Sequence, residues 1–223
     1  FPFKYNDYEK LEQIVYRENV GIIKMEVRRN EEPKNDFLNK VRKLATKKNI
    51  ILIFDECTSG FRRNLGGMHM TQKVYPDLCM FGKALGNGYA ITAVIGRKKF
   101  MKKAEDSFIS STFWTERVGF LAGLKTIEVM KKEKSWKKII ELGKFLNLKW
   151  LDLSKKYNLK INISGIESIT SFNFTSKNNL KYKTYISQEM LKKGFLASNT
   201  VFLSTTYTKD TIKKYIKNLE PIF

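Results

Sequence analysis

Histidine, cysteine and proline are scarce in this chain of 223 residues, which contains one, two and four of them respectively. Because His69 is the only histidine, no other histidine can take part in a Ser-His or Cys-His catalytic dyad, and most zinc clusters are excluded. We expect His69 itself in a loop or at the surface. Cys57 and Cys79 form neither a C-x-x-C pair nor a disulfide framework. The sequence therefore indicates no metal site and no oxidising compartment.

Long hydrophobic runs are also absent. No stretch of 18 or more apolar residues occurs, so we expect no transmembrane helix. The chain opens on Phe-Pro-Phe-Lys, without an initiator methionine and without the apolar segment of a secretion signal. We therefore expect a cytoplasmic protein, and we interpret the opening residues as the middle of a longer one.

Acidic residues are few: 22 stand against 42 basic residues, for a formal net charge of +20 at pH 7. Such a charge is typical of proteins that bind nucleic acid or an acidic membrane. The basic residues are dispersed, however, and no aromatic–basic motif of the RNA-binding kind is visible. We favour lysines spread over a solvated surface, and we expect neither nucleic acid nor a membrane as a partner.

The most informative stretch runs from Asn49 to Gly96. Continuous apolar runs without alternation are typical of strands buried on both faces of a parallel sheet. Asp55 directly follows the first such run, and Lys83 follows the second. Because ligands of these sheets bind beyond the carboxyl ends of the strands, we expect both side chains to face one site. The three apolar runs span residues 50–54, 78–81 and 91–95.

A carboxylate and a lysine at one site suit the chemistry of pyridoxal phosphate. The lysine amine can form a Schiff base with the cofactor aldehyde. The carboxylate keeps the pyridine nitrogen protonated and so makes the ring an electron sink. The alternatives are a turn-capping Asp55 and a surface Lys83. A P-loop is excluded because the pattern G-x-x-x-x-G-K-[ST] is absent.

The remaining pattern predicts an α/β chain with a domain boundary near Lys134. Helical spacing of apolar residues alternates with short strand-like runs, which is typical of βαβ units. Predicted helices span 8–19, 36–48, 97–104, 116–132, 135–157, 182–193 and 209–219. Further predicted strands span 20–27, 159–163, 168–174 and 195–198.

Three segments carry a family resemblance: FDECTSGFR from Phe54, PDLCMFGKALGNGYAITAVIGR from Pro76 and STFWTER from Ser111. In this order and spacing they resemble the class III (subgroup II) pyridoxal-phosphate aminotransferases, in the branch of glutamate-1-semialdehyde aminomutase. The resemblance implies a fold type I sheet in residues 1–134, with flanking helices, and a small α+β C-terminal domain in residues 135–223. It also implies that the N-terminal part is missing, so the isolated chain should bind the cofactor poorly and be inactive.

The resemblance also assigns roles around the cofactor. It places Asp55 at the pyridine nitrogen and makes Lys83 the Schiff-base residue. It packs Cys57 against the ring face and brings Thr58 near the phenolic oxygen. The family more often has Val at the position of Cys57 and Gln or Met at that of Thr58.

Two further residues are implied at the site. Thr112 matches a threonine that reaches the cofactor phosphate of the neighbouring subunit, which implies a homodimer with shared active sites; the alternative is a helix cap. Glu26 matches a strand-end glutamate near the substrate, and the alternative is an ion pair with Arg28 or Arg29. Residues 114–117, Trp-Thr-Glu-Arg, replace the family's usual Gly-Gly-Asn-Pro or Ser-Gly-Asn-Pro.

The sequence thus predicts a transaminase or an aminomutase of the glutamate-1-semialdehyde type. Its partners would be a small-molecule amino donor and a carbonyl acceptor, with pyridoxal 5'-phosphate as cofactor. The departure after Thr112 leaves the substrate open. The alternative is an inactive, truncated remnant that serves as a binding or structural subunit.

Overall fold

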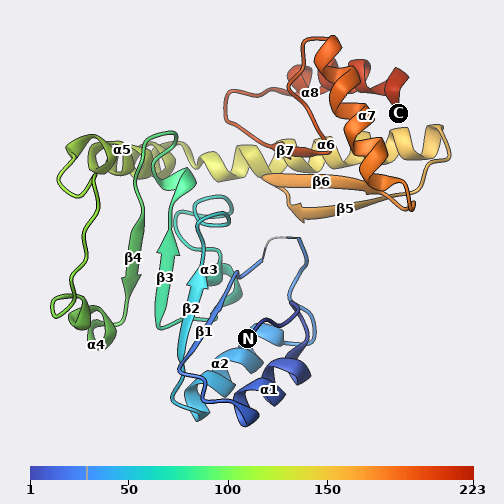
Figure 1. Ribbon diagram of the computed structural model, residues 1–223. Coiled ribbons are helices and arrows are strands. Elements are labelled where there is room, and N and C mark those ends of the chain that lie inside the picture. The colour runs from blue at the N-terminus through green and yellow to red at the C-terminus, as the bar shows by residue number, and fades with distance from the viewer. Residues whose placement is uncertain (29) are drawn as a thin grey trace. The chain divides into compact units, whose positions relative to one another are not determined.

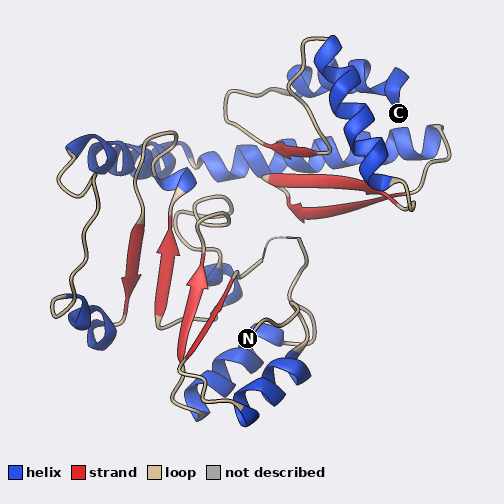
Figure 2. Cartoon of the chain, viewed as in Figure 1, coloured by secondary structure: helices blue, strands red, loops and turns tan. Residues whose placement is uncertain are grey.

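The computed structural model describes residues 1–28 and 30–223 of the chain. Two compact units divide it, Phe1–Lys134 and Ser135–Phe223. Figure 1 traces the chain through both units, and Figure 2 distinguishes their helices from their strands. Within the described part, no helix is both long enough and apolar enough to cross a membrane.

A four-stranded sheet in the order β1-β2-β3-β4 forms the centre of the first unit (Figure 1). The first three strands run parallel, and the fourth pairs antiparallel with β3. The expected parallel sheet is therefore confirmed for β1, β2 and β3, and the antiparallel β4 lies at one end of it. The strands are β1 (Ile22–Met25), β2 (Ile51–Asp55), β3 (Leu78–Phe81) and β4 (Ala93–Gly96).

Helices α1 (Tyr8–Arg17) and α2 (Phe37–Lys47) contact each other, and α2 also contacts β2. Their apolar residues recur at helical spacing, so each helix buries one stripe and leaves its charged residues in water. The buried residues of α2 are Phe37, Leu38, Val41, Leu44 and Ala45. Other short elements of this unit are α3 (His69–Gln72), η1 (Lys83–Leu85), α4 (Lys98–Met101) and η2 (Lys102–Ala104), followed by the long α5 (Arg117–Glu133).

Burial alternates along β1, β2 and β3, and no residue of β4 is fully buried, contrary to the prediction of strands buried on both faces. In β2, Leu52 and Phe54 are fully buried, whereas Ile51, Ile53 and Asp55 are half-buried. The apolar run is continuous, but the residues of this chain cover only one face of the strand fully. The other face carries the carboxylate of Asp55 and remains accessible.

Buried Asp77 joins three elements of this unit. Its Oδ2 accepts hydrogen bonds from the Leu52 backbone N–H at 2.9 Å and from Arg42 at 2.8 Å. Its Oδ1 lies 3.3 Å from the Arg97 guanidinium. Burial would raise the pKa of Asp77, but the bonds from Leu52 and Arg42 outweigh it and hold the pKa below its usual range. One carboxylate thereby fixes α2, β2 and the segment after β4 to each other.

The second unit combines an antiparallel three-stranded sheet, in the order β5-β6-β7, with three helices. Apolar side chains from α6, β6, α7 and α8 form its core, and Trp150, Phe172 and Met190 are fully buried there. A Cβ at Gly143 would overlap the Glu167 carbonyl oxygen, so α6 lies against the β5–β6 turn only because this residue is glycine. The elements are α6 (Ser135–Lys156), β5 (Ile161–Ile166), β6 (Ile169–Phe174), α7 (Asn179–Lys192), β7 (Thr200–Phe202), α8 (Lys209–Leu219) and η3 (Glu220–Ile222).

The last predicted strand is wrong in position. Residues 195–198 are irregular, and the strand β7 lies at Thr200–Phe202 instead. There it pairs with β6 through three residues, with Ile169 opposite Phe202. Such a short strand is defined by its partner rather than by its own pattern, so periodicity alone could not locate it.

Candidate functional site

Asp55 ends β2 on the accessible face of the sheet. Its Oδ1 accepts a hydrogen bond from the Cys57 backbone N–H at 3.2 Å, and its Oδ2 lies 3.1 Å from the Lys24 amine. Burial would raise the pKa of Asp55, but the bonds from Lys24 and Cys57 outweigh it and lower the pKa below its usual value. The carboxylate is therefore ionised at neutral pH and ready to hold a cationic group.

Lys83 follows β3 directly after Gly82 and begins η1. Its Nζ donates a hydrogen bond to the Thr58 Oγ1 at 2.7 Å, which joins the segment after β3 to the turn after β2. The backbone of Lys83 has φ of 45°, in the left-handed region that costs non-glycine residues roughly 1–2 kcal/mol. Strain of this kind is often found at functional sites, where the surroundings hold a residue in place.

Cys57 lies between the carboxylate and the lysine. A Cβ on Gly82 would be 3.6 Å from its Sγ, so the thiol packs beside the backbone that precedes Lys83. Burial, the hydrogen bond to Asp55 and the charge of that carboxylate raise the pKa of the Cys57 thiol, against the opposing charges of Lys83 and Lys24. The thiol is therefore neutral at pH 7 and offers a compact, weakly polar surface rather than a nucleophile.

The structure thus brings Asp55, Cys57, Thr58 and Lys83 together at the carboxyl ends of β2 and β3. It does not bring Thr112 to them: Thr112 is exposed in a turn before α5, and among the described residues no hydrogen bond joins it to the other four. Because Thr112 lies four residues before the N-cap of α5, Glu116, it does not cap that helix.

Glu26 directly follows β1 and is half-buried. Burial raises the pKa of Tyr5, and the charges of Glu31 and Glu26 add to this against the opposing charge of Arg28, so Glu26 lies near Tyr5. Arg28 forms an ion pair with Glu32 at 2.7 Å. Arg29, the other partner considered for Glu26, lies outside the described residues.

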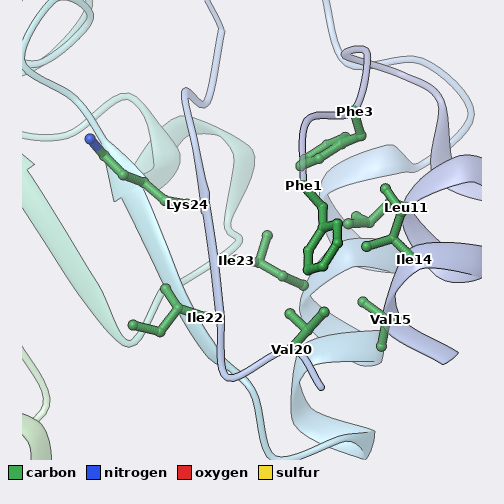
Figure 3. Close-up of a pocket in the computed structure, with 9 residues that line it drawn as sticks. All are labelled: Phe1, Phe3, Leu11, Ile14, Val15, Val20, Ile22, Ile23 and Lys24. Atoms are coloured by element: carbon green, nitrogen blue, oxygen red, sulfur yellow. The ribbon is translucent and has the colours of Figure 1, made fainter. Parts of the chain in front are cut away.

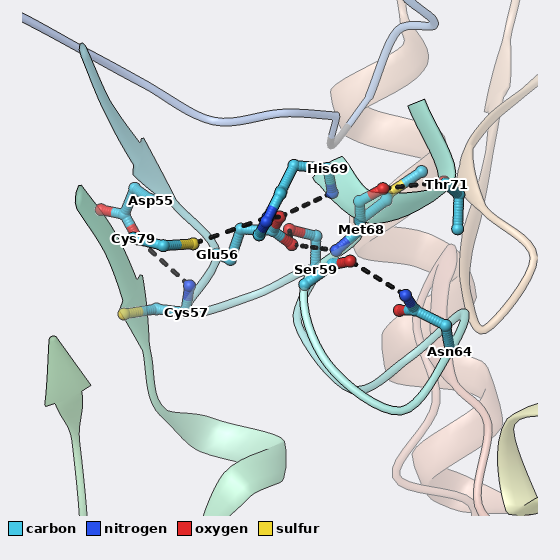
Figure 4. Close-up of polar contacts among 10 residues, drawn as sticks. Asp55, Glu56, Cys57, Ser59, Asn64, Met68, His69, Thr71 and Cys79 are labelled. Atoms are coloured by element: carbon cyan, nitrogen blue, oxygen red, sulfur yellow. Dashed lines mark hydrogen bonds and ion pairs between the residues drawn. The ribbon is translucent and has the colours of Figure 1, made fainter. Parts of the chain in front are cut away.

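Glu56 is one of the residues that the sequence analysis missed. Its side chain is fully buried, and Figure 4 shows it among donors from Ser59 and from the segment after Gly67. Oε1 accepts from the N–H and Nδ1 of His69 at 2.8 and 2.7 Å, and Oε2 accepts from the Met68 N–H at 2.6 Å and from the Ser59 hydroxyl at 2.9 Å. The only sequence signal was an acidic residue directly after a strand.

His69 is buried in this network, so the prediction of a loop or surface position is wrong. It begins α3, and its ring also lies 3.8 Å from the Cys79 Sγ. Ligand atoms of Glu56, His69 and Cys79 lie within 4.8 Å of one another, at a spacing that a metal ion could use. Both Glu56 oxygens, however, are engaged by two donors each, so these groups are a self-satisfied hydrogen-bond network.

The sequence and the fold of this chain are similar to those of known proteins. A model of the class III aminotransferases matches residues 31–223. A 3-aminobutyryl-CoA aminotransferase of Cloacimonas acidaminovorans is 34% identical over 174 residues, which cover 74% of this chain and 42% of that protein. A glutamate-1-semialdehyde 2,1-aminomutase of Hyperthermus butylicus is 30% identical over 243 residues, which cover 99% of this chain and 57% of that protein.

Solved structures share the fold. The PLP internal aldimine form of the FumI protein of Sphingopyxis sp. MTA144 superposes with a TM-score of 0.92 at 21% identity, over 100% of this chain and 56% of that one. An omega-transaminase of Sphaerobacter thermophilus superposes with a TM-score of 0.89 at 19% identity, over 99% of this chain and 56% of that one. The chain therefore spans about half the length of the relatives it matches. From the matched residues and the shared fold, the chain belongs to the class III aminotransferase family.

Proposed function

We propose that this chain is the lysine-bearing part of a pyridoxal-phosphate-dependent transaminase, or of an aminomutase of the glutamate-1-semialdehyde type. The observation that carries the proposal is the grouping of an amine, a hydroxyl, a thiol and an ionised carboxylate at the ends of two parallel strands. Lys83 donates to Thr58, and Cys57 lies within reach of the charges of both Asp55 and Lys83.

The donor set fits the cofactor. Asp55 has a lowered pKa, so it presents the anion that a protonated pyridine nitrogen requires. Lys83 presents a primary amine, which can bind an aldehyde covalently. The side chains of Cys57 and Thr58 lie between these two and are small enough to leave room beside a flat ring. When bound, pyridoxal phosphate supplies an electron-withdrawing ring that stabilises negative charge on a substrate carbon.

The residues of the chain then have separate tasks. Asp55 would hold the proton on the ring nitrogen. The Lys83 amine would anchor the cofactor, and its Nζ, once free, would hold and move a proton at the substrate carbon that bears the amino group. Thr58, which accepts from Lys83 at 2.7 Å, orients that amine.

Thr112 and Glu26 extend the proposal to a second protomer and to the substrate. Thr112, exposed ahead of α5, would contact the cofactor phosphate of a neighbouring protomer, so the working unit would be a homodimer. Glu26, at the end of β1, would lie near the substrate. The substrates would be a small amino donor and a carbonyl acceptor.

The test is selective labelling of Lys83. The chain is mixed with one equivalent of pyridoxal phosphate, reduced with borohydride, digested and mapped by mass spectrometry. We expect the added mass chiefly on the peptide that contains Lys83, and its loss from that site in Lys83→Ala. Lys98→Ala, which removes an exposed lysine from α4, should keep the label. Equal labelling of surface lysines in all three proteins would overturn the proposal.

The second candidate function is the alternative named from the sequence. The chain would then be a subunit without activity of its own, which keeps the fold and serves as a binding surface. In that case borohydride would leave no preferred label on Lys83, while the chain would remain folded.

A further inference from the structure

Among the residues that the structure describes, Lys24 forms the ion pair with Asp55, and its position follows from strand register. In the parallel pair β1–β2, Lys24 is opposite Ile53, so these two side chains point to the same face of the sheet. Asp55 lies two residues beyond Ile53 and shares that face. The amine of Lys24 reaches forward along the sheet to lie 3.1 Å from Asp55 Oδ2.

The lysine is directed toward this carboxylate and away from the apolar groups around it. Figure 3 shows its amine pointing away from the apolar side chains of a small pocket, among them Phe1, Leu11 and Ile23. Burial alternates along β1, with Ile23 and Met25 in the core and Lys24 outward. The side chains of Lys24 and Asp55 are 52% and 26% exposed, so the ion pair is reachable from solvent.

The ion pair engages the same carboxylate that the proposed function needs. Oδ1 of Asp55 already accepts the Cys57 N–H, and Oδ2 faces Lys24. A protonated ring nitrogen is a cation that seeks the same carboxylate. Two cations that share one carboxylate repel each other, so the lysine must weaken the hold on the ring nitrogen.

We propose that Lys24 is a resident counter-ion of Asp55, which fixes the carboxylate in place and competes with the protonated ring nitrogen of the cofactor. The inference rests on the proposed function, because the competitor is the pyridine nitrogen of pyridoxal phosphate. Lys24 is a positioning residue: it acts through Asp55 and sets the affinity for a basic ring nitrogen.

Binding of two ligands tests this. Dissociation constants are measured for pyridoxal phosphate and for 1-deazapyridoxal phosphate, in which a carbon replaces the ring nitrogen. We expect Lys24→Met to bind pyridoxal phosphate roughly two- to fivefold more tightly, the range that follows from a half-exposed ion pair. Its affinity for the deaza analogue should not change. Lys24→Arg should behave like the unaltered chain, because it restores the cation.

The control is Lys98→Met, which removes the same charge from an exposed site on α4. Equal changes for both ligands, or no change for either, would overturn the role of Lys24 and leave the proposed function intact. Failure of every protein to bind pyridoxal phosphate even at high ligand concentration, where the weak affinity expected of this chain suffices, would overturn both. A second readout is the pKa of Asp55, followed by carbon-13 NMR without cofactor: it should rise in Lys24→Met, and an unchanged pKa would contradict the ion pair.

Discussion

Asp55 and Glu56 are neighbours in the chain with opposite environments. The carboxylate of Asp55 is half-buried and faces Lys24, whereas that of Glu56 is fully buried and accepts from four donors. The end of a strand turns successive side chains to opposite sides, which separates the two roles. Asp55 is available to a ligand, and Glu56 fixes the segment that contains Met68 and His69.

Replacing Glu56 by glutamine should therefore destabilise the fold. An amide offers one acceptor oxygen and one NH₂ group, so at least one buried N–H would face another donor. We expect Glu56→Gln to lower the free energy of unfolding by about 2–3 kcal/mol, from the usual strength of hydrogen bonds to a buried charge. Urea denaturation measures this. Glu9→Gln, on the exposed side of α1, is the matched control, and an equal effect there would refute the assignment.

At the scale of elements, Asp77 joins helix α2 to strand β2, which the hydrogen bonds between strands do not do. It is nearly inaccessible, and it ties α2 through Arg42 to β2 through the Leu52 N–H. We expect Asp77→Asn to cost about 2–3 kcal/mol of stability at neutral pH, because hydrogen bonds to a buried charge are lost. Asp152→Asn, at an exposed pair on α6, should have little effect.

The effect of Asp77 should depend on pH with a definite sign. Its folded-state pKa lies below the ordinary value of 3.8, so its contribution is present above pH 3.8 and is lost as pH falls through the folded pKa. The stability gap between the unaltered chain and Asp77→Asn should therefore be constant near neutrality and shrink only below pH 3.8. A gap that closes between pH 5 and 7 would show that another group is responsible.

Elements with many periodic residues could be predicted from the sequence. The strand β3 and the helix α8 have the predicted bounds, and α1, α5 and α6 differ by one or two residues at their ends. The short elements α3 and β7, of four and three residues, could not be predicted, because tertiary contacts decide both. The strand β3 is equally short but could be predicted, because it is a continuous apolar run. Elements rich in local pattern are therefore predictable, and those set by distant partners are not.

The same distinction holds for the candidate site. Asp55 directly follows one apolar run, and Lys83 follows another after Gly82. Because ligands bind beyond the carboxyl ends of parallel strands, the sequence could predict that the two side chains share a site. Lys24 was missed because its partner depends on the register of β1 against β2, which no local pattern gives. Glu56 was missed because its donors at Met68 and His69 lie 12 and 13 residues further along the chain.

For the whole molecule, the second unit has a core of its own. Buried residues from α6, β6, α7 and α8 form one cluster, which lies entirely within Ser135–Phe223. We expect a fragment of these residues to fold by itself and to unfold cooperatively on heating. Circular dichroism at increasing temperature tests this, with Trp150→Ala as the variant that should abolish the transition, since Trp150 is fully buried. A fragment with no transition would refute the independence of the unit.

The positive φ of Lys83 has a consequence for which residue evolution would retain at this position. Its φ of 45° would suit glycine better than lysine, so the fold would gain stability from losing this side chain. Under laboratory evolution for heat resistance alone, glycine or asparagine should displace lysine here. A chain relieved of chemical duty would be free to drift the same way, as it would at Lys73 and Lys134, whose backbones lie in the same left-handed region.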